Sequence, residues 1–331
     1  MTTTTTDDDD VIKIIPTHTT KNNDNKDAAV VVDKSWNHFV WLNLLFYIIN
    51  SLATYSIQLG WLDLPTNGDL SDKYQTIVTP FGLSFSIWGL IFMWQLVWVV
   101  WQLLPSQRNS EGVLKAWYYY PIMAVLQACW TFSFAYEIMW LALIFMYGIL
   151  FTLVRASMSL QTYQKTWKGY LLWQAPFSIQ TGWIMAASAV NTNVLPVAYD
   201  ASTTAKIVVS SLSLVVLLVT AFTWLSSYPV DFAIPCVIVW ALYGVYSELE
   251  APMTSITEEF TMKQITGVRN GVLAAMILIG VGIILKIVYV FAKQRPAAIQ
   301  AKATQEQAQE HTKTNSDQSA SEKEVDAEET V

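Results

Sequence analysis

Residues 80–104 form an apolar run without a charged side chain, and Arg108 is the next charged residue after it. The hydrocarbon core of a bilayer is about 30 Å thick, and a helix of about 20 apolar residues crosses it. Soluble domains have about 25% charged residues, whereas this chain has 14% charged and 53% hydrophobic residues. The sequence therefore predicts a membrane protein with helical spans, because a helix satisfies its own backbone hydrogen bonds in lipid.

The same pattern recurs along the chain. We predict an all-α fold, a polytopic transmembrane helix bundle with about eight spans. Only Glu137 separates the third span from the fourth, which predicts a tight hairpin. Gln127, Gln180 and Glu248 interrupt or bound the third, fifth and seventh spans. The predicted spans cover approximately residues 36–58, 80–104, 116–136, 138–160, 170–191, 205–226, 231–249 and 270–292.

Polar tails flank these spans. Residues 1–35 are rich in Thr and Asp, and residues 295–331 are rich in Gln, Glu, Ser and Lys. Neither segment has enough apolar side chains to offset the entropy of ordering, so we expect both to be disordered cytosolic tails. Between them we expect a core of five helices at 36–192 and three additional transmembrane helices at 193–294.

The distribution of basic residues predicts the orientation. If the spans alternate, most Lys and Arg residues near the span ends fall on one side, and acidic residues gather on the other. The positive-inside rule then puts both termini in the cytosol and loop 59–79 on the opposite side. We expect a multi-pass integral membrane protein whose organelle the sequence does not identify. The basic side carries Lys34, Arg108, Lys115, Arg155, Lys165, Lys168, Lys293 and Arg295, and the other side carries Lys73, Lys206, Lys263 and Arg269.

The spans contain few groups that could perform chemistry. Lys286 is expected to reach toward the membrane interface, and Glu137 and Glu248 are expected to be solvated at helix ends. The sequence has no clustered metal ligands, no GxSxG motif and no glycine-rich phosphate loop. We therefore predict no catalytic residues, no metal site, no required cofactor and no enzymatic activity.

Aromatic and amide side chains share one face in each of three spans. On an α-helix, the spacing puts Phe81 and Phe85 on the same face as Trp88. It likewise puts Trp130 on the same face as Gln127, and Trp183 on the same face as Gln180. Facing stripes of this kind would form an apolar cavity with few polar groups, which is typical of a small-molecule site. Alternatively, the amides join neighbouring helices by hydrogen bonds, and the aromatic rings only pack.

Two further features belong to the second span. Trp94, Trp98 and Trp101 lie on roughly the opposite face from Trp88. Gly82 and Gly89 form a third, narrow face, where we expect a neighbouring helix to approach closely.

Three stretches resemble one family. The segment "NGDLSDKYQTIVTPFGLSFSIWGLIFMWQLVWVVWQLLPSQR" resembles the TPxGxxFSIWGLIY stretch of the larger tryptophan-rich sensory proteins, relatives of the translocator protein (TspO/MBR) family. The segment "APFSIQTGWIMAASAVN" is similar to that family's PFSxxxGWxxxAxxxN helix. "LQACWTFSFAYE" resembles its NxxWxxxFF helix, with Gln127 in place of Asn and Ala135 in place of a second aromatic residue. The resemblance covers residues 36–192.

The resemblance implies a five-helix bundle with a cavity, covered by the loop between the first two helices, that binds tetrapyrroles, sterols or related hydrophobic molecules. No His lies in the middle of a span, so a bound porphyrin would be held by ring stacking rather than by an iron ligand. The residues expected at the ligand are Trp88, Trp130, Trp183 and Asn191, with Pro80 and Phe85 as supports and Gln127 and Gln180 on the same stripes.

The expected function is binding of such a ligand in a sensory, receptor or translocator role. The alternatives are a carrier of a hydrophobic solute and an enzyme that degrades a tetrapyrrole. The expected partners are membrane lipids and the hydrophobic ligand, without nucleic acid, and a homodimer is compatible with this prediction. The sequence leaves open the physiological ligand and the role of the three C-terminal helices.

Overall fold

A computed structural model describes residues 37–163 and 166–293. These residues form helices and no β-strand, so the all-α prediction is confirmed for the described part of the chain. The predicted tails, residues 1–35 and 295–331, lie outside the described residues.

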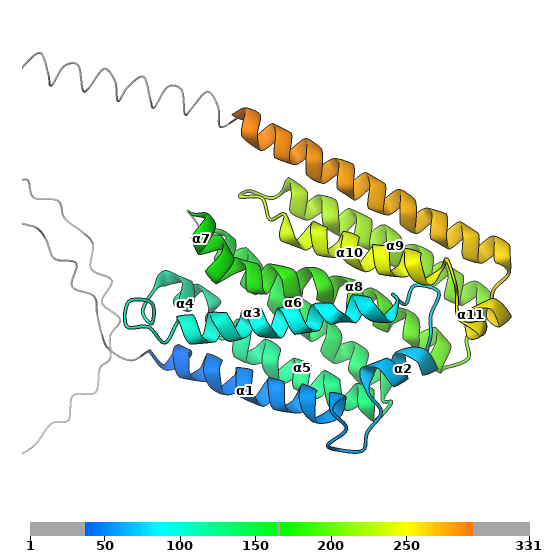
Figure 1. The fold of residues 1–331 in the computed structure, drawn as a ribbon, viewed down its shortest axis with the longest axis horizontal. Coiled ribbons are helices and arrows are strands. Elements are labelled where there is room, and N and C mark those ends of the chain that lie inside the picture. Colours follow the sequence, from blue (N-terminus) through cyan, green and yellow to red (C-terminus); the bar gives the residue numbers. More distant parts are fainter. Residues whose placement is uncertain (1–36, 164–165, 294–331) are drawn as a thin grey trace, which may run out of the picture. The chain divides into compact units, whose positions relative to one another are not determined.

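Long helices run side by side along the bundle, and short helices lie at its ends (Figure 1). The described chain begins and ends at the same end of the bundle, where α4 (Glu111–Ala116) and α7 (Trp167–Gly169) lie. At the other end lie α2 (Asn67–Lys73) and α11 (Thr254–Glu259). The long helices are α1 (His38–Gln58), α3 (Ile87–Trp101), α5 (Tyr119–Ala135), α6 (Met139–Gln161), α8 (Ala175–Ala198), α9 (Thr203–Ser226), α10 (Ala233–Glu248) and the last described helix, Met262–Lys293.

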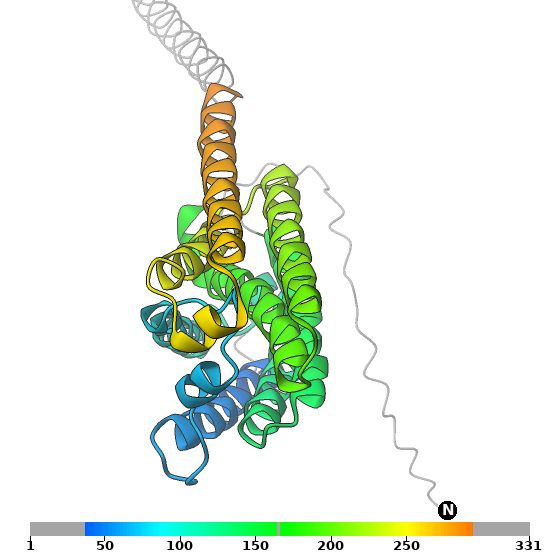
Figure 2. The ribbon, with the colours of Figure 1, turned by 90° about the vertical axis from the view of Figure 1, so that its right-hand side faces the viewer.

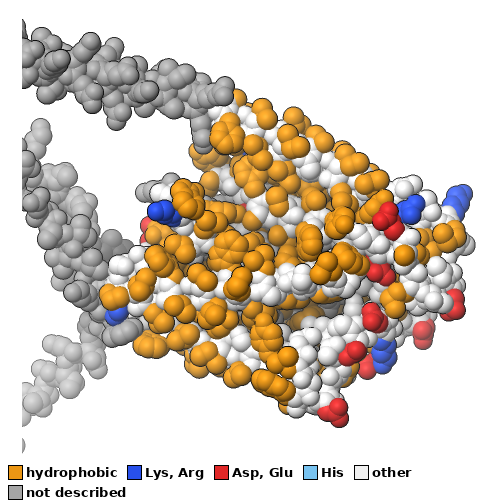
Figure 3. Space-filling model, viewed as in Figure 1, with side chains coloured by type: hydrophobic (Ala, Val, Ile, Leu, Met, Phe, Trp, Pro, Cys, Tyr) orange, Lys and Arg blue, Asp and Glu red, His pale blue; other side chains and the backbone are white. Residues whose placement is uncertain are grey.

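Five of the described helices are long and apolar enough to cross a membrane. They are α1, the continuous segment Gly82–Trp101, α6, α9 and the helix Met262–Lys293. Hydrophobic side chains cover the middle of the visible face, and charged side chains lie near the ends (Figure 3). This distribution is the one a bilayer requires, because lipid solvates apolar side chains and water solvates the charges.

The other three predicted spans, now α5, α8 and α10, do not meet this criterion. Helix α10 has only 16 residues and ends at Glu248. Helices α5 and α8 carry the buried amides Gln127 and Gln180. Most residues of α8 are buried by other helices. A helix that contacts protein rather than lipid can bear amides, because neighbouring helices satisfy their hydrogen bonds.

The tight hairpin between α5 and α6 is present. Glu137 adopts the left-handed conformation with a φ of 59°. The N–H of Ile138 donates to the carbonyl of Ser133, and the N–H of Glu137 donates to the carbonyl of Phe134, each at 2.9 Å. These two bonds satisfy the last carbonyls of α5 in the manner of a Schellman motif. The chain therefore reverses direction at Glu137.

The predicted α-helical second span is wrong at its start, because Gly82–Ser86 is a 3₁₀ helix, η1, which precedes α3. A 3₁₀ helix has three residues per turn rather than 3.6, so it shifts Phe81 away from the face that carries Trp88. The Phe81 ring lies 6.3 Å from that of Tyr243 in α10, whereas the Phe85 ring lies 5.7 Å from that of Trp183 in α8.

Neighbouring helices approach closely at glycines other than the predicted Gly82 and Gly89. An added Cβ would meet nothing within 4 Å at Gly82 or Gly89. At Gly244 of α10, it would lie 2.1 Å from the Ser84 hydroxyl oxygen, and at Gly182 of α8 it would lie 2.8 Å from the carbonyl oxygen of Ile234. Helix α10 therefore packs tightly on both η1 and α8.

Helix α8 links the two halves of the bundle. It contacts α3 and α6 on one side and α9 and α10 on the other, and it continues past residue 192 to Ala198. It is preceded by a π-helical turn, η2 (Tyr170–Gln174). Figure 2 shows α1 and α2 at the opposite side of the bundle from the helix Met262–Lys293. Helices α9 and α10 therefore pack directly on the helix that carries Trp183 and Asn191.

Candidate functional site

Two adjacent cavities lie between the helices that carry the predicted site residues. A narrow chamber of about 60 Å³ lies between α3, α5, α8, α9 and α10. A wider vestibule of about 540 Å³ lies beneath α2 and reaches α1. The two cavities are adjacent, and seven residues line both. These shared residues are Asn67, Ser71, Thr79, Pro80, Phe85, Trp88 and Trp130.

Aromatic rings form the wall of the chamber. The ring planes of Trp88 and Trp130 are 23° apart, with centroids separated by 6.5 Å. The ring of Trp183 meets that of Trp88 edge to face at 6.3 Å and that of Phe85 at 5.7 Å. Phe134 stacks on Trp130 at 5.4 Å. Helices α3, α5 and α8 thus each contribute one tryptophan to a single aromatic surface.

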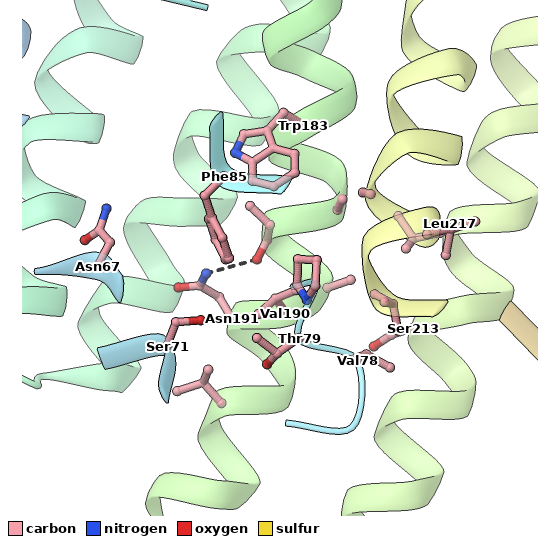
Figure 4. Close-up of a pocket in the computed structure, with 18 of the residues that line it drawn as sticks. Asn67, Ser71, Val78, Thr79, Phe85, Trp183, Val190, Asn191, Ser213 and Leu217 are labelled. Carbon is pink, nitrogen blue, oxygen red and sulfur yellow. Dashed lines mark hydrogen bonds between the residues drawn. The ribbon is translucent and has the colours of Figure 1, made fainter. Parts of the chain in front are cut away.

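Two polar groups of this surface differ in their hydrogen bonding. The indole N–H of Trp130 donates to the Asn191 side-chain oxygen at 3.0 Å. The Asn191 amide donates to the carbonyl of Ala187 at 2.9 Å (Figure 4). The indole N–H of Trp183 is buried and has no partner in the described part of the chain. A buried donor without an acceptor is unfavourable by about 1–3 kcal/mol.

A layer of glutamines lies next to the aromatic surface. The Gln95 amide donates to the Gln180 side-chain oxygen at 2.6 Å, and the Gln180 amide donates to the Gln127 side-chain oxygen at 2.8 Å. The Tyr120 hydroxyl donates to the Gln95 oxygen at 3.3 Å. Gln127 also lines the vestibule, whereas Gln180 lines neither cavity. We refer to Gln95, Gln127 and Gln180 as the amide layer.

The structure therefore brings the predicted site residues together, except Gln180. Trp183 and Asn191 line the chamber, and Gln127 lines the vestibule. Gln180 instead joins α8 to α3 and α5 within the amide layer, which is the alternative role considered for it.

Helix α2 covers the vestibule. Thr66 and Asp69 form a capping box at the start of α2, and Leu70 is the buried residue of this helix. At its end, the Lys73 ammonium and the Tyr74 hydroxyl both donate to the Glu137 carboxylate. Glu137 was expected to be solvated at a helix end, and its side chain is partly exposed, but it also holds the end of α2 on the α5–α6 hairpin.

The electrostatics of this contact follow from the hydrogen bonds. The bonds from Lys73 and Tyr74 stabilise the carboxylate, so the pKa of Glu137 is lower than that of an ordinary glutamate. The same bond from Tyr74 stabilises its protonated form, and the pKa of Tyr74 is raised. A second contact lies just after α2, where the Gln75 amide donates to the Glu248 carboxylate at 3.1 Å.

The part of the chamber wall that α9 and α10 provide was not predicted from the sequence. Ser213 and Leu217 come from α9, and Ala241, Leu242 and Val245 come from α10. Figure 4 shows Ser213 and Leu217 on the opposite side from Asn67 and Ser71 of α2. No aromatic or amide stripe marks these residues, and only their helical spacing could have suggested a common face.

Asp231, which lies just before α10 in the chain and is completely buried, was also not predicted. Its carboxylate accepts hydrogen bonds from the Gln174 amide at 2.6 Å, from the Tyr170 hydroxyl at 3.1 Å, and from the Ser178 hydroxyl. These donors compensate for burial of the charge. The cluster joins the start of α10 to η2 and α8, and it lines neither cavity. Across residues 37–163 and 166–293, no group of three or more His, Cys, Asp or Glu could hold a metal ion.

These features define a polytopic helical membrane protein with an aromatic internal cavity. Residues 40–288 match a protein-family model described as TSPO-like protein, and because the match covers more than half of the chain, the protein belongs to this family. The family resemblance is thus confirmed, and it extends beyond residue 192 through α9 and α10. Searches of curated proteins and of solved structures gave no significant match.

Proposed function

We propose that the protein binds a flat hydrophobic molecule, tetrapyrrole-like or sterol-like, and acts as a membrane sensor, receptor or translocator for it. The observation that carries this proposal is the aromatic surface that Trp88, Trp130 and Trp183 form around one cavity. A porphyrin suits this surface best, because stacking on an aromatic ring contributes about 0.5–1.5 kcal/mol beyond the area buried.

The ring geometry supports a planar ligand. The planes of Trp88 and Trp130 are 23° apart, and the ring centroids are separated by 6.5 Å. The two rings therefore offer a planar molecule similarly oriented surfaces for stacking. The unpartnered Trp183 N–H offers a hydrogen bond to an acceptor on that molecule.

The cavity sizes indicate where the ligand lies. Small-molecule sites typically enclose about 300–1,000 Å³. The vestibule, at about 540 Å³, is large enough for the body of such a ligand, whereas the chamber, at about 60 Å³, is not. In our proposal the ligand body occupies the vestibule under α2, and one edge enters between the tryptophans.

We also propose an orientation, with both termini in the cytosol and α2 on the opposite side of the membrane. The excess of basic residues near the span ends on one side supports it. Tags at residue 2 and residue 331 should both be cut by protease in sealed vesicles that expose the cytosolic face. Protection of one tag while the other is cut would contradict the orientation.

The test of ligand binding is a porphyrin titration of purified protein, followed by tryptophan fluorescence quenching. Trp183→Ala removes a ring from the aromatic surface, so the affinity should fall by about 2 kcal/mol, or about thirtyfold. Trp183→Phe keeps a ring and should lose less.

The matched control is Trp94→Ala. Trp94 lies on another face of α3, donates to the carbonyl of Leu171 at 2.8 Å, and lines neither cavity. Its replacement should leave the affinity nearly unchanged in protein whose melting temperature is near that of the wild type. Equal losses from Trp94→Ala and Trp183→Ala would contradict the site.

A further inference from the structure

A third cavity lies on the outside of the bundle, between α6, α8 and α9. This groove has a volume of about 400 Å³ and is lined mainly by aliphatic side chains, including Leu150, Val154 and Met185. Leu212 and Val216 on its rim are 60% and 61% exposed. Because they belong to α9, a helix apolar enough to span a membrane, the groove faces the lipid.

Only one layer of side chains separates this groove from the chamber. Ala189 of α8 and Ser213 and Leu217 of α9 line both cavities. Figure 4 shows Ser213 and Leu217 at the edge of the chamber that lies away from α2. We call Ala189, Ser213 and Leu217 the seam. The seam is thin because two of its three side chains are small.

Among the described residues, the polar side-chain contacts that join α8 to α9 at the seam involve Asn193. The Asn193 amide donates to the Ser213 hydroxyl at 2.9 Å, and the Ser210 hydroxyl donates to the Asn193 oxygen at 2.7 Å. Next to the seam, the Ser188 hydroxyl lines the groove side of α8, is buried, and has no partner among the described residues. An unpartnered hydroxyl in a membrane interior is unfavourable, and it would gain a partner if a polar group entered the seam.

We infer that the seam is a lateral portal through which the hydrophobic ligand passes between the bilayer and the chamber. This inference rests on the proposed function. An apolar ligand concentrates in lipid, and the groove presents it with an apolar surface that continues to the tryptophans. Separation of α8 from α9 at the seam also widens a chamber that is too narrow for a macrocycle at about 60 Å³.

The alternative route passes through the vestibule, and the structure makes it less favourable for an apolar molecule. Asp72 and Glu248 line the vestibule. Helix α2 covers it and is held by the contact of Lys73 and Tyr74 with Glu137. A ligand that takes this route must leave the lipid and displace α2.

The test uses protein in phosphatidylcholine vesicles and a porphyrin supplied in the lipid, with stopped-flow quenching of tryptophan fluorescence. Leu217→Phe thickens the seam and should slow association and dissociation together by about tenfold, a change within the range seen among variants of one interface. Asn193→Leu removes both contacts that hold the seam and should accelerate both rates. Leu212→Phe is the matched control, because Leu212 lines the groove but not the chamber, and its rates should equal those of the wild type.

The outcomes separate the portal from the binding site. Opposite changes from Leu217→Phe and Asn193→Leu, with the control unchanged, support the portal even if one variant is less stable. Wild-type rates in both variants, with equilibrium quenching intact, would overturn the portal alone. Absence of equilibrium quenching in the wild-type protein would overturn the proposed function and the portal together.

Discussion

The amide layer and the aromatic surface are built from the same three helices but differ in how their polar groups are satisfied. Helix α3 supplies Gln95 and Trp88, α5 supplies Gln127 and Trp130, and α8 supplies Gln180 and Trp183. The three glutamines hydrogen-bond to one another in a continuous chain. The three tryptophans surround space, and one of them, Trp183, has a buried N–H without a partner.

This difference separates a structural role from a binding role. A satisfied polar network inside a membrane fixes the positions of helices, because each break leaves a polar group in an apolar environment. An aromatic surface around a cavity contributes less to stability than the same rings packed tightly, because rings beside empty space lack contacts on one side. We therefore expect substitutions in the amide layer to affect stability and substitutions in the aromatic surface to affect binding.

Gln180→Leu should have the largest effect. It leaves the Gln95 donor and the Gln127 acceptor buried without their partner, and each orphaned group is unfavourable by about 1–3 kcal/mol. We expect the free energy of unfolding to fall by about 3 kcal/mol, measured by thermal melting in detergent. Porphyrin affinity of the remaining folded protein should change little.

The matched control replaces all three glutamines with leucine. This triple variant also removes the Gln95 and Gln127 amides that Gln180→Leu leaves without partners. Its free energy of unfolding should therefore be closer to that of the wild type than is that of Gln180→Leu. If the triple variant were less stable than Gln180→Leu, the network would not be the source of the effect.

Trp88→Ala should have the next largest effect, and it should lower porphyrin affinity rather than stability. Trp88 is half-buried and lines both cavities. Its loss removes one of the two nearly parallel rings, so porphyrin affinity should fall by about 1.4 kcal/mol, or about tenfold, with a smaller change in melting temperature. A large fall in melting temperature with unchanged affinity would reverse the roles assigned to the two regions.

Glu137→Gln should have the smallest effect, because the contact between Lys73 and Glu137 is near the surface. The pKa of Glu137 is lowered in the folded protein, so its carboxylate stabilises the fold at pH values above the ordinary glutamate pKa. This contribution disappears as the pH falls through the lowered pKa. Hydrogen exchange of the α2 amides should therefore be faster in Glu137→Gln than in wild type at pH 7.

The two proteins should converge in acid, where the wild-type carboxylate is also neutral. A difference of the same size at pH 7 and in strong acid would mean that charge at Glu137 does not hold α2. Porphyrin affinity should follow the aromatic surface rather than this contact, and it should change less than in Trp88→Ala.

Local spacing predicted the parts of the site that lie within one regular helix. Gln127 and Trp130, or Gln180 and Trp183, are three residues apart, so α-helical geometry puts them on one face. The same reasoning failed at Phe81, because η1 has a different number of residues per turn. Spacing also does not show which residue of a helix face lines a cavity and which contacts another helix. Gln180 hydrogen-bonds to two other glutamines, whereas Trp183 lines the chamber.

Contacts between distant segments were not predictable from spacing. Nothing in the sequence near Ser213 or Leu217 marks a cavity wall, because these residues resemble ordinary lipid-facing positions of α9. Likewise, the sequence did not predict the contacts of Glu137 with Lys73 and Tyr74, which precede it by more than sixty residues. Such contacts depend on how the helices are arranged, and that arrangement depends on many side chains at once.

Because α9 and α10 form part of the chamber wall, the chamber can close only after these late helices have been synthesised. Ribosomes make α3, α5 and α8 before α9 and α10, and earlier parts of a chain can begin to fold while later parts are still being made. At that stage the tryptophans already have their helices, but the side formed by Ser213, Leu217 and Ala241 is missing. A nascent chain that ends before Thr203 should thus expose its aromatic surface to lipid, and acyl chains or an early ligand could occupy it until residues 203–248 arrive and close it.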